Sequence, residues 1–240
     1  MADKNAPLIP QEGWHCLHLF YRIDFAQWQL LSADEQRTAK VALSEIVQEI
    51  RATEKTQLLT LSVVMEPVYS YLSLTEESEY TTAPEQYAET LASEQNLKAG
   101  TPEFEAAMKS FAERMAHYRQ ERVYPTLPDW PVVCFYNMSK RRGEQRNWYA
   151  LPFDDRRKLM GGHAKVGREF TGKVKQLITG STGLDDAEWG VTLFARDTFQ
   201  IKKIVYEMRF DRVSADYADF GEFFVGIQLP LDELFRRLQL

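Results

Sequence analysis

The order of strand-like and helix-like segments in the second half of the chain constrains its fold more than any other feature. Runs rich in β-branched and aromatic residues indicate strands, and apolar residues at helical spacing indicate helices between them. The segments are a strand at 132–138, a helix at 153–170, strands at 174–181 and 188–195, a helix at 198–209 and a strand at 223–229. This order, β-α-β-β-α-β, is that of a ferredoxin-like α+β unit.

The first half resembles the opening of the same unit. A strand-like run at 14–24 precedes an amphipathic helix, for which Ser32 is the expected N-cap and Glu35 completes a capping box. Strand-like runs at 57–65 and 68–74 follow this helix. The sequence therefore predicts an α+β protein of the dimeric α/β-barrel type, with two ferredoxin-like halves side by side.

The expected organisation is an N-terminal half at 1–80, a helical connection at 81–121 and a C-terminal half at 122–240. The connection is polar and charged and has helical periodicity in its second part. Thr101 followed by a proline is typical of a helix start. We expect this helix to lie over the surface, with His117 solvated or packed and not functional.

Charge and cysteine content exclude several classes of protein. The 240 residues carry a formal net charge of −6, whereas a general nucleic-acid binder shows a clustered basic excess. The two cysteines, Cys16 and Cys134, lie in apolar runs and are expected to be buried thiols of a reducing compartment. With no signal-peptide pattern and no apolar stretch of spanning length, a cytoplasmic protein without a membrane span is expected.

His163 lies in the apolar stripe of the predicted helix at 153–170. The residues that share its face are Leu159, Met160, Val166, Gly167 and Phe170. The imidazole is therefore expected to face inward, where it either binds a metal or haem iron or fills the core with its nitrogens satisfied locally. The residues alone leave both roles open and favour the core histidine.

The densest polar cluster leaves the end of the strand at 132–138. Alternation places Tyr136, Met138 and Lys140 on one face, which presents a phenol, a thioether and an ammonium together. An oxidisable phenol beside a cation suits a site that handles carboxylates and one-electron chemistry. The alternative, which the residues alone favour, is a solvated basic turn after an edge strand.

Other candidate residues are distant in sequence. Arg122, Arg209 and Ser214 come from different segments, and Arg209 is most simply a cation at a helix C-terminus. If Arg209 converged with Arg122 and Lys140, the three cations would bind several carboxylates. Gln176 is a lone amide on an apolar strand face, equally consistent with a buried hydrogen-bonded residue and with the polar group of a ligand pocket.

Several common chemistries lack a motif. No zinc-like spacing of His and Cys is found, no glycine-rich phosphate loop is present, and no nucleophile elbow occurs.

Six segments together resemble the chlorite dismutase-like superfamily, and within it the coproheme decarboxylases, or hydrogen-peroxide-dependent haem synthases. The segments are YNMSKRR at 136–142, NWYALP at 147–152, GHAKVGR at 162–168, Gln176, EWGVTLF at 188–194 and EMRF at 207–210. The match runs from about residue 122 to residue 226 nearly without gaps.

The resemblance implies a ferredoxin-like subunit, usually in a homopentamer, that holds the porphyrin in its C-terminal half. His163 matches the proximal iron ligand, and Tyr136 matches the tyrosine that becomes a radical. The residues that match positions around the propionates are Arg122, Met138, Lys140, Arg209 and Ser214. Gln176 matches the distal residue, which is an arginine in chlorite dismutases proper, so it argues against chlorite chemistry.

The implied function is peroxide-dependent oxidative decarboxylation of two propionates of iron-coproporphyrin III (coproheme) to vinyl groups, giving haem b. Coproheme is then both substrate and redox cofactor, with Tyr136 and Lys140 as catalytic residues. A ferrochelatase is the implied partner for handover of coproheme. The alternatives are a haem peroxidase or chlorite-degrading enzyme and a non-enzymatic haem-binding protein of the same fold.

The chain departs from the family pattern in two places. Asn137 stands where the family usually has a proline, next to the critical Tyr136. The chain also passes from Met65 to Val68 where relatives carry another strand and helix. The N-terminal half is therefore expected to be an abbreviated ferredoxin-like unit.

Overall fold

The computed structural model describes residues 12–63, 69–80 and 97–240. The strands are β1 (Glu12–Phe20), β2 (Leu61–Val63), β3 (Tyr69–Glu76), β4 (Val132–Lys140), β5 (Val174–Gly180), β6 (Trp189–Ala195) and β7 (Ala218–Gln228). The helices are α1 (Phe25–Leu30), α2 (Ala33–Ala52), α4 (Pro102–Val123), α5 (Phe153–Arg168), α6 (Thr198–Met208), α7 (Arg212–Tyr217) and α8 (Leu231–Arg237).

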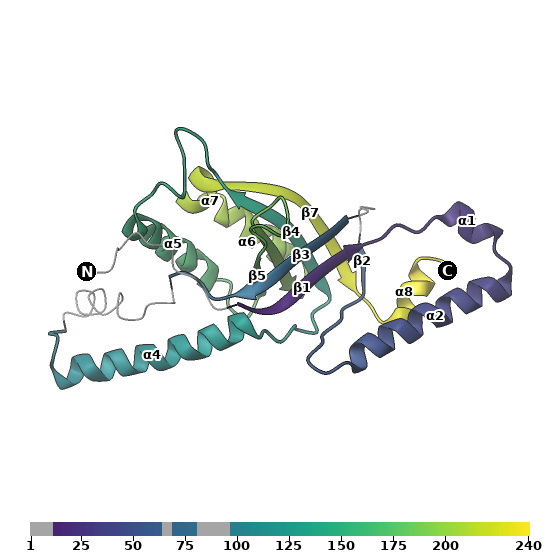
Figure 1. Ribbon diagram of the computed structural model, residues 1–240, viewed down its shortest axis with the longest axis horizontal. Coiled ribbons are helices and arrows are strands. Elements are labelled where there is room, and N and C mark those ends of the chain that lie inside the picture. Colours follow the sequence, from purple (N-terminus) through teal and green to yellow (C-terminus); the bar gives the residue numbers. More distant parts are fainter. Residues whose placement is uncertain (1–11, 64–68, 81–96) are drawn as a thin grey trace.

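The seven strands form one curled sheet in the order β1-β3-β5-β6-β4-β7-β2, and neighbouring strands are antiparallel (Figure 1). Within it, the strands of the second half lie in the order β5-β6-β4-β7. The first and third strands of that half are thus central, as the ferredoxin-like topology requires. The predicted fold class is confirmed.

The strands of the first half extend the same sheet. β1 pairs with β3, β3 joins β5 through the pairs Leu74↔Gly180 and Thr75↔Thr179, and β2 pairs with β7. The strand expected at 57–65 is shorter, because β2 begins at Leu61 and residues 64–68 lie outside the described part. The division into 1–80, 81–121 and 122–240 stays a prediction.

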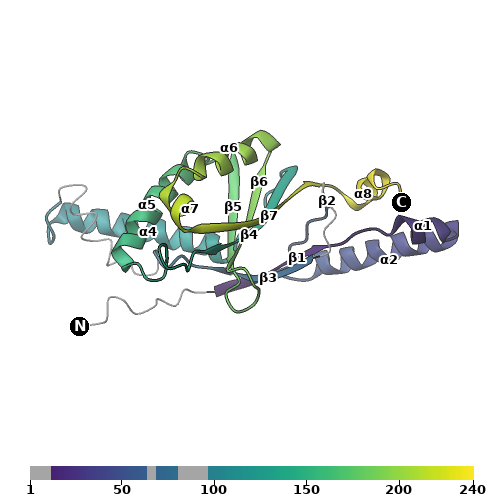
Figure 2. The same cartoon turned by 90° about the horizontal axis from the view of Figure 1, so that it is seen from above.

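Helices α5, α6 and α7 gather on one face of the sheet (Figure 2). The core beneath them contains alternate residues of three neighbouring strands: Cys134 and Tyr136, Val174, and Val191, Leu193 and Ala195. The opposite face has its own aromatic core of Tyr71, Phe135 and Phe224. Successive residues of β4 therefore serve two different cores, as strand alternation requires.

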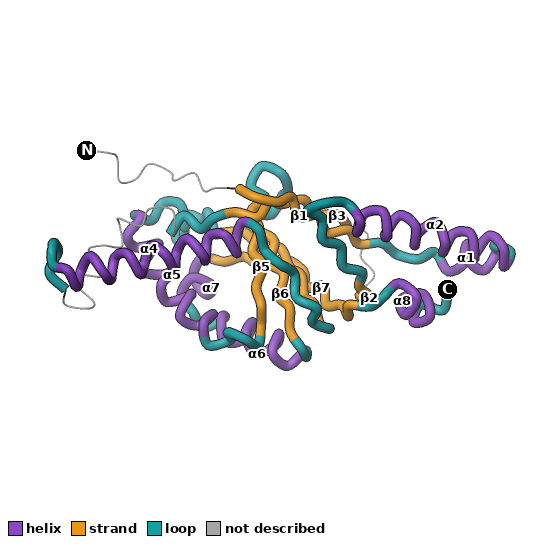
Figure 3. Tube along the Cα trace, turned by 90° about the horizontal axis from the view of Figure 1, so that it is seen from below, coloured by secondary structure: helices purple, strands orange, loops and turns teal. Residues whose placement is uncertain are grey.

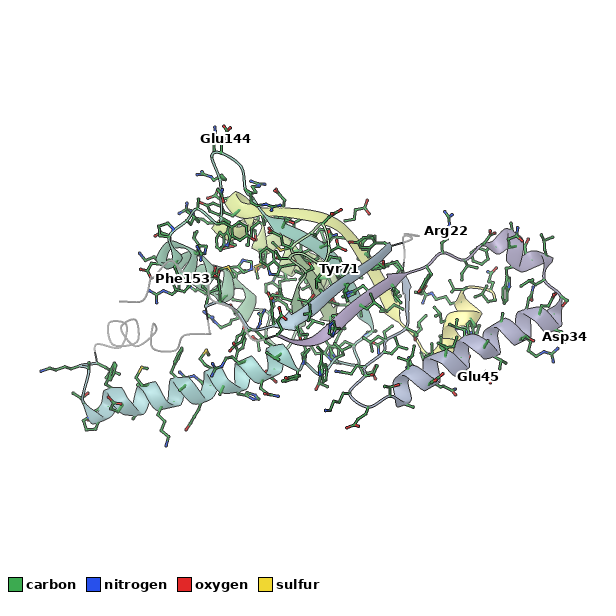
Figure 4. The ribbon with its side chains drawn as sticks, in the orientation of Figure 1. Arg22, Asp34, Glu45, Tyr71, Glu144 and Phe153 are labelled. Carbon is green, nitrogen blue, oxygen red and sulfur yellow. The ribbon has the colours of Figure 1, made fainter. Side chains whose placement is uncertain are left out.

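Two long helices leave the sheet (Figures 1 and 3). The expected capping box of α2 is present, since Ser32 and Glu35 exchange hydrogen bonds at its start. Thr101 caps α4 and its proline stands in the first turn. On α4, His117 is exposed and its Nε2 lies 3.9 Å from Glu121, which agrees with the solvated role expected for it. In Figure 4, Glu45 is labelled on α2, apart from the sheet, whereas Tyr71 is labelled among the strands.

Short helices were not predicted from the sequence. Residues 25–30 form α1 where the strand at 14–24 was expected to end, because Asp24 accepts a hydrogen bond from the Gln27 N–H and so starts a helix. Cys134 is fully buried, Cys16 is partly buried, and both are free thiols. In the described ranges, no helix is both long and apolar enough to cross a membrane.

Gly190 of β6 faces the aromatic core of Tyr71 and Phe135, so an added methyl group there should be poorly tolerated. A Cβ there would lie 2.6 Å from Tyr71 Cε1 and 3.1 Å from Phe135 Cε2. We expect Gly190→Ala to lower the free energy of unfolding by about 1–3 kcal/mol through overpacking, measured by urea denaturation.

Gly161→Ala is the matched control, because nothing lies within 4 Å of a Cβ at this position in α5. Alanine is a better helix former than glycine, so the free energy of unfolding of this variant should rise by about 0.5–1 kcal/mol. Equal effects of the two substitutions would contradict the packing described for Gly190.

Candidate functional site

Tyr136 occupies the centre of the sheet face that α5, α6 and α7 cover. Its side chain is buried, and its ring stacks on Phe223 with the ring centroids 4.4 Å apart. Met138 lies two residues further along β4 and packs against the same core. Burial raises the pKa of Tyr136 well above its usual value, so the phenol keeps its proton at neutral pH.

Arg209 brings a cation to this phenol. Its guanidinium carbon lies 3.8 Å from the ring centroid of Phe220 and 5.9 Å from that of Phe223. The positive charge of Arg209 acts against burial and lowers the pKa of Tyr136 by a smaller amount. Arg209 is thus the C-cap of α6, as its position suggested, and also a neighbour of Tyr136.

Lys140 ends the same row of β4. Its Nζ lies 4.6 Å from the ring centroid of Trp148, and burial lowers the pKa of the ammonium from 10.5 to about 8. The charges of Asp211 and Glu188 act in the opposite direction. Lys140 is therefore a largely desolvated cation that gains from a further anion.

His163 is fixed by a carboxylate that sequence reasoning missed. Its Nδ1 lies 2.8 Å from Asp211 Oδ2, which also accepts hydrogen bonds from the backbone N–H groups of Val213 (3.0 Å) and Ser214 (3.2 Å) at the start of α7. Burial alone would raise the pKa of Asp211, but these hydrogen bonds hold it below its usual range. The arrangement orients the imidazole and leaves Nε2 to bind a metal, as in other carboxylate–histidine pairs.

His18 shows a contrasting case. His18 of β1 stacks on Phe135 with centroids 4.0 Å apart, and its Nε2 lies 3.0 Å from Thr192 Oγ1. Burial lowers the pKa of His18 to about 4, so this ring is neutral. His18 is a satisfied core histidine, whereas His163 is partly exposed and held by a carboxylate.

Gln176 faces α5 from the sheet. A Cβ at Gly167, one turn beyond His163, would lie 3.4 Å from Gln176 Nε2 and 3.4 Å from Met208 Cε. The amide on β5 and the imidazole on α5 thus border the same layer between sheet and helices. The glycines of α5 keep the helix surface flat there.

The structure brings most of the predicted residues to this layer. On or beside the covered face are Tyr136, Met138, Lys140, His163, Gln176, Arg209 and Ser214. Ser214 is buried, and its backbone N–H donates to Asp211. Arg122 makes its contacts elsewhere: its Nε donates to the Glu76 carbonyl (3.2 Å) and its Nη1 to Tyr118 Oη (3.4 Å).

The donor set fits an iron porphyrin with carboxylate side chains. One imidazole with an anchored Nδ1 is suited to iron, and Gly161, Gly162 and Gly167 present no side chain that would block a planar ring beside it. Lys140 and Arg209 supply charges that pair with carboxylates. Asp211 could have been found from its place as an acidic N-cap three residues before Ser214.

The chlorite dismutase family model matches residues 32–229, which is most of the chain. The chain therefore belongs to the chlorite dismutase family. Among solved structures, a heme-binding protein from Thermus thermophilus is 34% identical, with a TM-score of 0.79 and 98% of each chain covered. A chlorite dismutase from Candidatus Nitrospira defluvii in complex with imidazole is 13% identical, with a TM-score of 0.60, 94% of this chain and 95% of that chain covered, and shows the fold alone.

Asp211 should stabilise the protein through its cap as well as through His163. We expect Asp211→Ala to lower the free energy of unfolding by about 0.5–2 kcal/mol, because the first turn of α7 loses its acceptor. Asp211→Asn keeps an equally good capping group and should lower the free energy of unfolding by clearly less. Urea denaturation of the two variants measures the difference, and equal losses would contradict a capping role.

Proposed function

We propose that this protein converts coproheme to haem b, using hydrogen peroxide to decarboxylate two propionates. The observation that carries the proposal is the buried Tyr136 phenol on the layer that His163 borders, with Arg209 beside it and Lys140 further along the same row of β4. An oxidisable residue in the same layer as an iron ligand and carboxylate-binding cations is what such chemistry requires. The resemblance to coproheme decarboxylases supports the same assignment.

The residues have distinct tasks in this proposal. His163 binds the iron through Nε2 and Asp211 keeps its ring oriented. Lys140 and Arg209 pair with propionates, with Met138 and Ser214 as their neighbours, and so hold one propionate against Tyr136. Arg122 would join them only if its bonds to Glu76 and Tyr118 were exchanged for a propionate, since its guanidinium already donates to both.

Bound coproheme supplies the iron at which peroxide is reduced to water. The Tyr136 phenol, kept protonated by burial, gives up an electron and a proton together and then takes a hydrogen atom from the β-carbon of a propionate. Loss of CO2 and a second electron leaves a vinyl group. Each round balances as R–CH2–CH2–COO⁻ + H2O2 + H⁺ → R–CH=CH2 + CO2 + 2 H2O.

Two other functions are compatible with the fold. A chlorite-degrading enzyme or peroxidase would use the same iron, but Gln176 is a neutral amide at the position where chlorite dismutases carry an arginine. A non-enzymatic haem-binding protein is favoured by the relative described as heme-binding. Ferric coproheme and haem b titrations, followed by peroxide or chlorite, separate the three through the Soret spectrum, the porphyrin products and the release of oxygen.

Tyr136→Phe should abolish product formation without abolishing substrate binding. We expect coproheme affinity within about threefold of the wild type, because the ring and its stacking remain, and haem b formation reduced by about 100-fold or more. Product analysis after peroxide addition measures both propionates. A variant that still made the divinyl product would refute the assignment of Tyr136.

Coproheme affinity should depend on the ionisation of Lys140. Because burial lowers the pKa of Lys140 to about 8 and only the ammonium pairs with a propionate, affinity should be constant below that pH and fall above it. Lys140→Met should remove this fall in affinity at high pH, whereas the control Lys202→Met on the exposed side of α6 should keep it. Soret titrations over a pH series measure it, and an unchanged fall in Lys140→Met would contradict the pairing.

We also propose a homo-oligomer, with the pentamer of the family as the expected form. Apolar side chains on β1 and α2 support it: Leu17 is 56% exposed, Leu19 49% and Ile46 53%. Exposed apolar surface of this kind marks interaction sites. Handover of coproheme from a ferrochelatase and a cytoplasmic location stay predictions.

A further inference from the structure

The pairing of β4 with β7 is interrupted next to Tyr136. Tyr136 pairs with Phe223, but Met138 pairs with Phe220, so the single residue Asn137 lies opposite Gly221 and Glu222. This count of two residues against one defines a β-bulge in β7. On the other side of β4 the pairing with β6 continues without a shift.

The bulge determines which aromatic rings contact the ring of Tyr136. Phe220 and Phe223 are three positions apart, so in a regular strand their side chains would lie on opposite faces of the sheet. With the extra residue both rings contact Tyr136, at centroid distances of 5.8 and 4.4 Å. Both also lie under the guanidinium of Arg209.

Asn137 fills the bulge from the opposite face. A Cβ at Gly221 would overlap Asn137 Oδ1, so the amide occupies space that only a glycine leaves free. Asn137 Nδ2 donates a 3.0 Å hydrogen bond to Tyr69 Oη. The amide therefore connects the bulge to β3, a strand that pairs with neither β4 nor β7.

We propose that Asn137 is a positioning residue, which together with Gly221 and Tyr69 holds the bulge and thereby sets the Phe220–Tyr136–Phe223 arrangement. A proline, usual in the family at this position, fixes the backbone through its ring. Here the side-chain amide and its bond to Tyr69 perform the same task. The catalytic consequence rests on the proposed function, because it requires Tyr136 to be the oxidised residue.

The first test needs no porphyrin. The contribution of Tyr136 to near-ultraviolet circular dichroism is the difference between a protein and its Tyr136→Phe counterpart. We expect this difference to fall at least about twofold in an Asn137→Ala or Tyr69→Phe background. It should stay unchanged in the control Tyr21→Phe, whose side chain is 75% exposed. An unchanged signal in both backgrounds would overturn the proposal.

The second test uses coproheme and peroxide. Asn137→Ala should slow decarboxylation by about 10-fold to 100-fold while coproheme affinity stays within about threefold, because misplacement of the reacting group affects the chemical step. Asn137→Pro should restore the rate. Equal losses of affinity and rate, or no rescue by proline, would overturn the positioning role. If the wild type made no haem b, the proposed function would fail, and the dichroism would still decide whether Asn137 holds Tyr136.

Discussion

The pairing of β4 on both of its edges is the constraint on which the rest of the structure depends. Because β4 lies between β6 and β7, its backbone is fixed by two antiparallel ladders, and residues 132–136 are buried. Alternation then divides its side chains between two cores, with Tyr136 on one face and Phe135 on the other. Tyr136 is therefore held by a strand that is paired on both edges, which suits a residue whose distance to a substrate must not vary.

The helices supply the other residues of the candidate site, and the Asp211 carboxylate links two of these helices. Asp211 caps α7 and holds His163 of α5, so it links these two helices through hydrogen bonds. α5 packs on α6 and α7, and α6 packs on β5 and β6. The His163 imidazole on α5 and the Gln176 amide on β5 therefore border the same layer between the helices and the sheet.

Much of the fold could be predicted from the sequence because long, buried elements have clear periodicity. The β-α-β-β-α-β order of the second half and both long-helix caps were predicted correctly. The short helices α1, α7 and α8 were missed, since six or seven residues show too little periodicity. β7 was expected from residue 223 but begins at Ala218, because the bulge at Gly221 interrupts the alternation that marks a strand.

The site was predictable only in part. Strand alternation predicted that Tyr136 and Met138 share a face, and helical spacing predicted that His163 faces inward. Convergence of Lys140 with Asp211, and the position of Arg209 over Phe220, depend on tertiary packing that no local pattern records. Arg122 donates hydrogen bonds to the Glu76 carbonyl and the Tyr118 hydroxyl, and this arrangement also depends on tertiary packing.

The proposed function requires that the ligand of this site is also its substrate. Mass spectrometry of the porphyrin after stepwise addition of peroxide to the coproheme complex tests it most directly. We expect loss of CO2 and two hydrogens from one propionate, then from a second, ending at haem b. Recovery of unchanged coproheme, or of bleached porphyrin without a vinyl product, would contradict it.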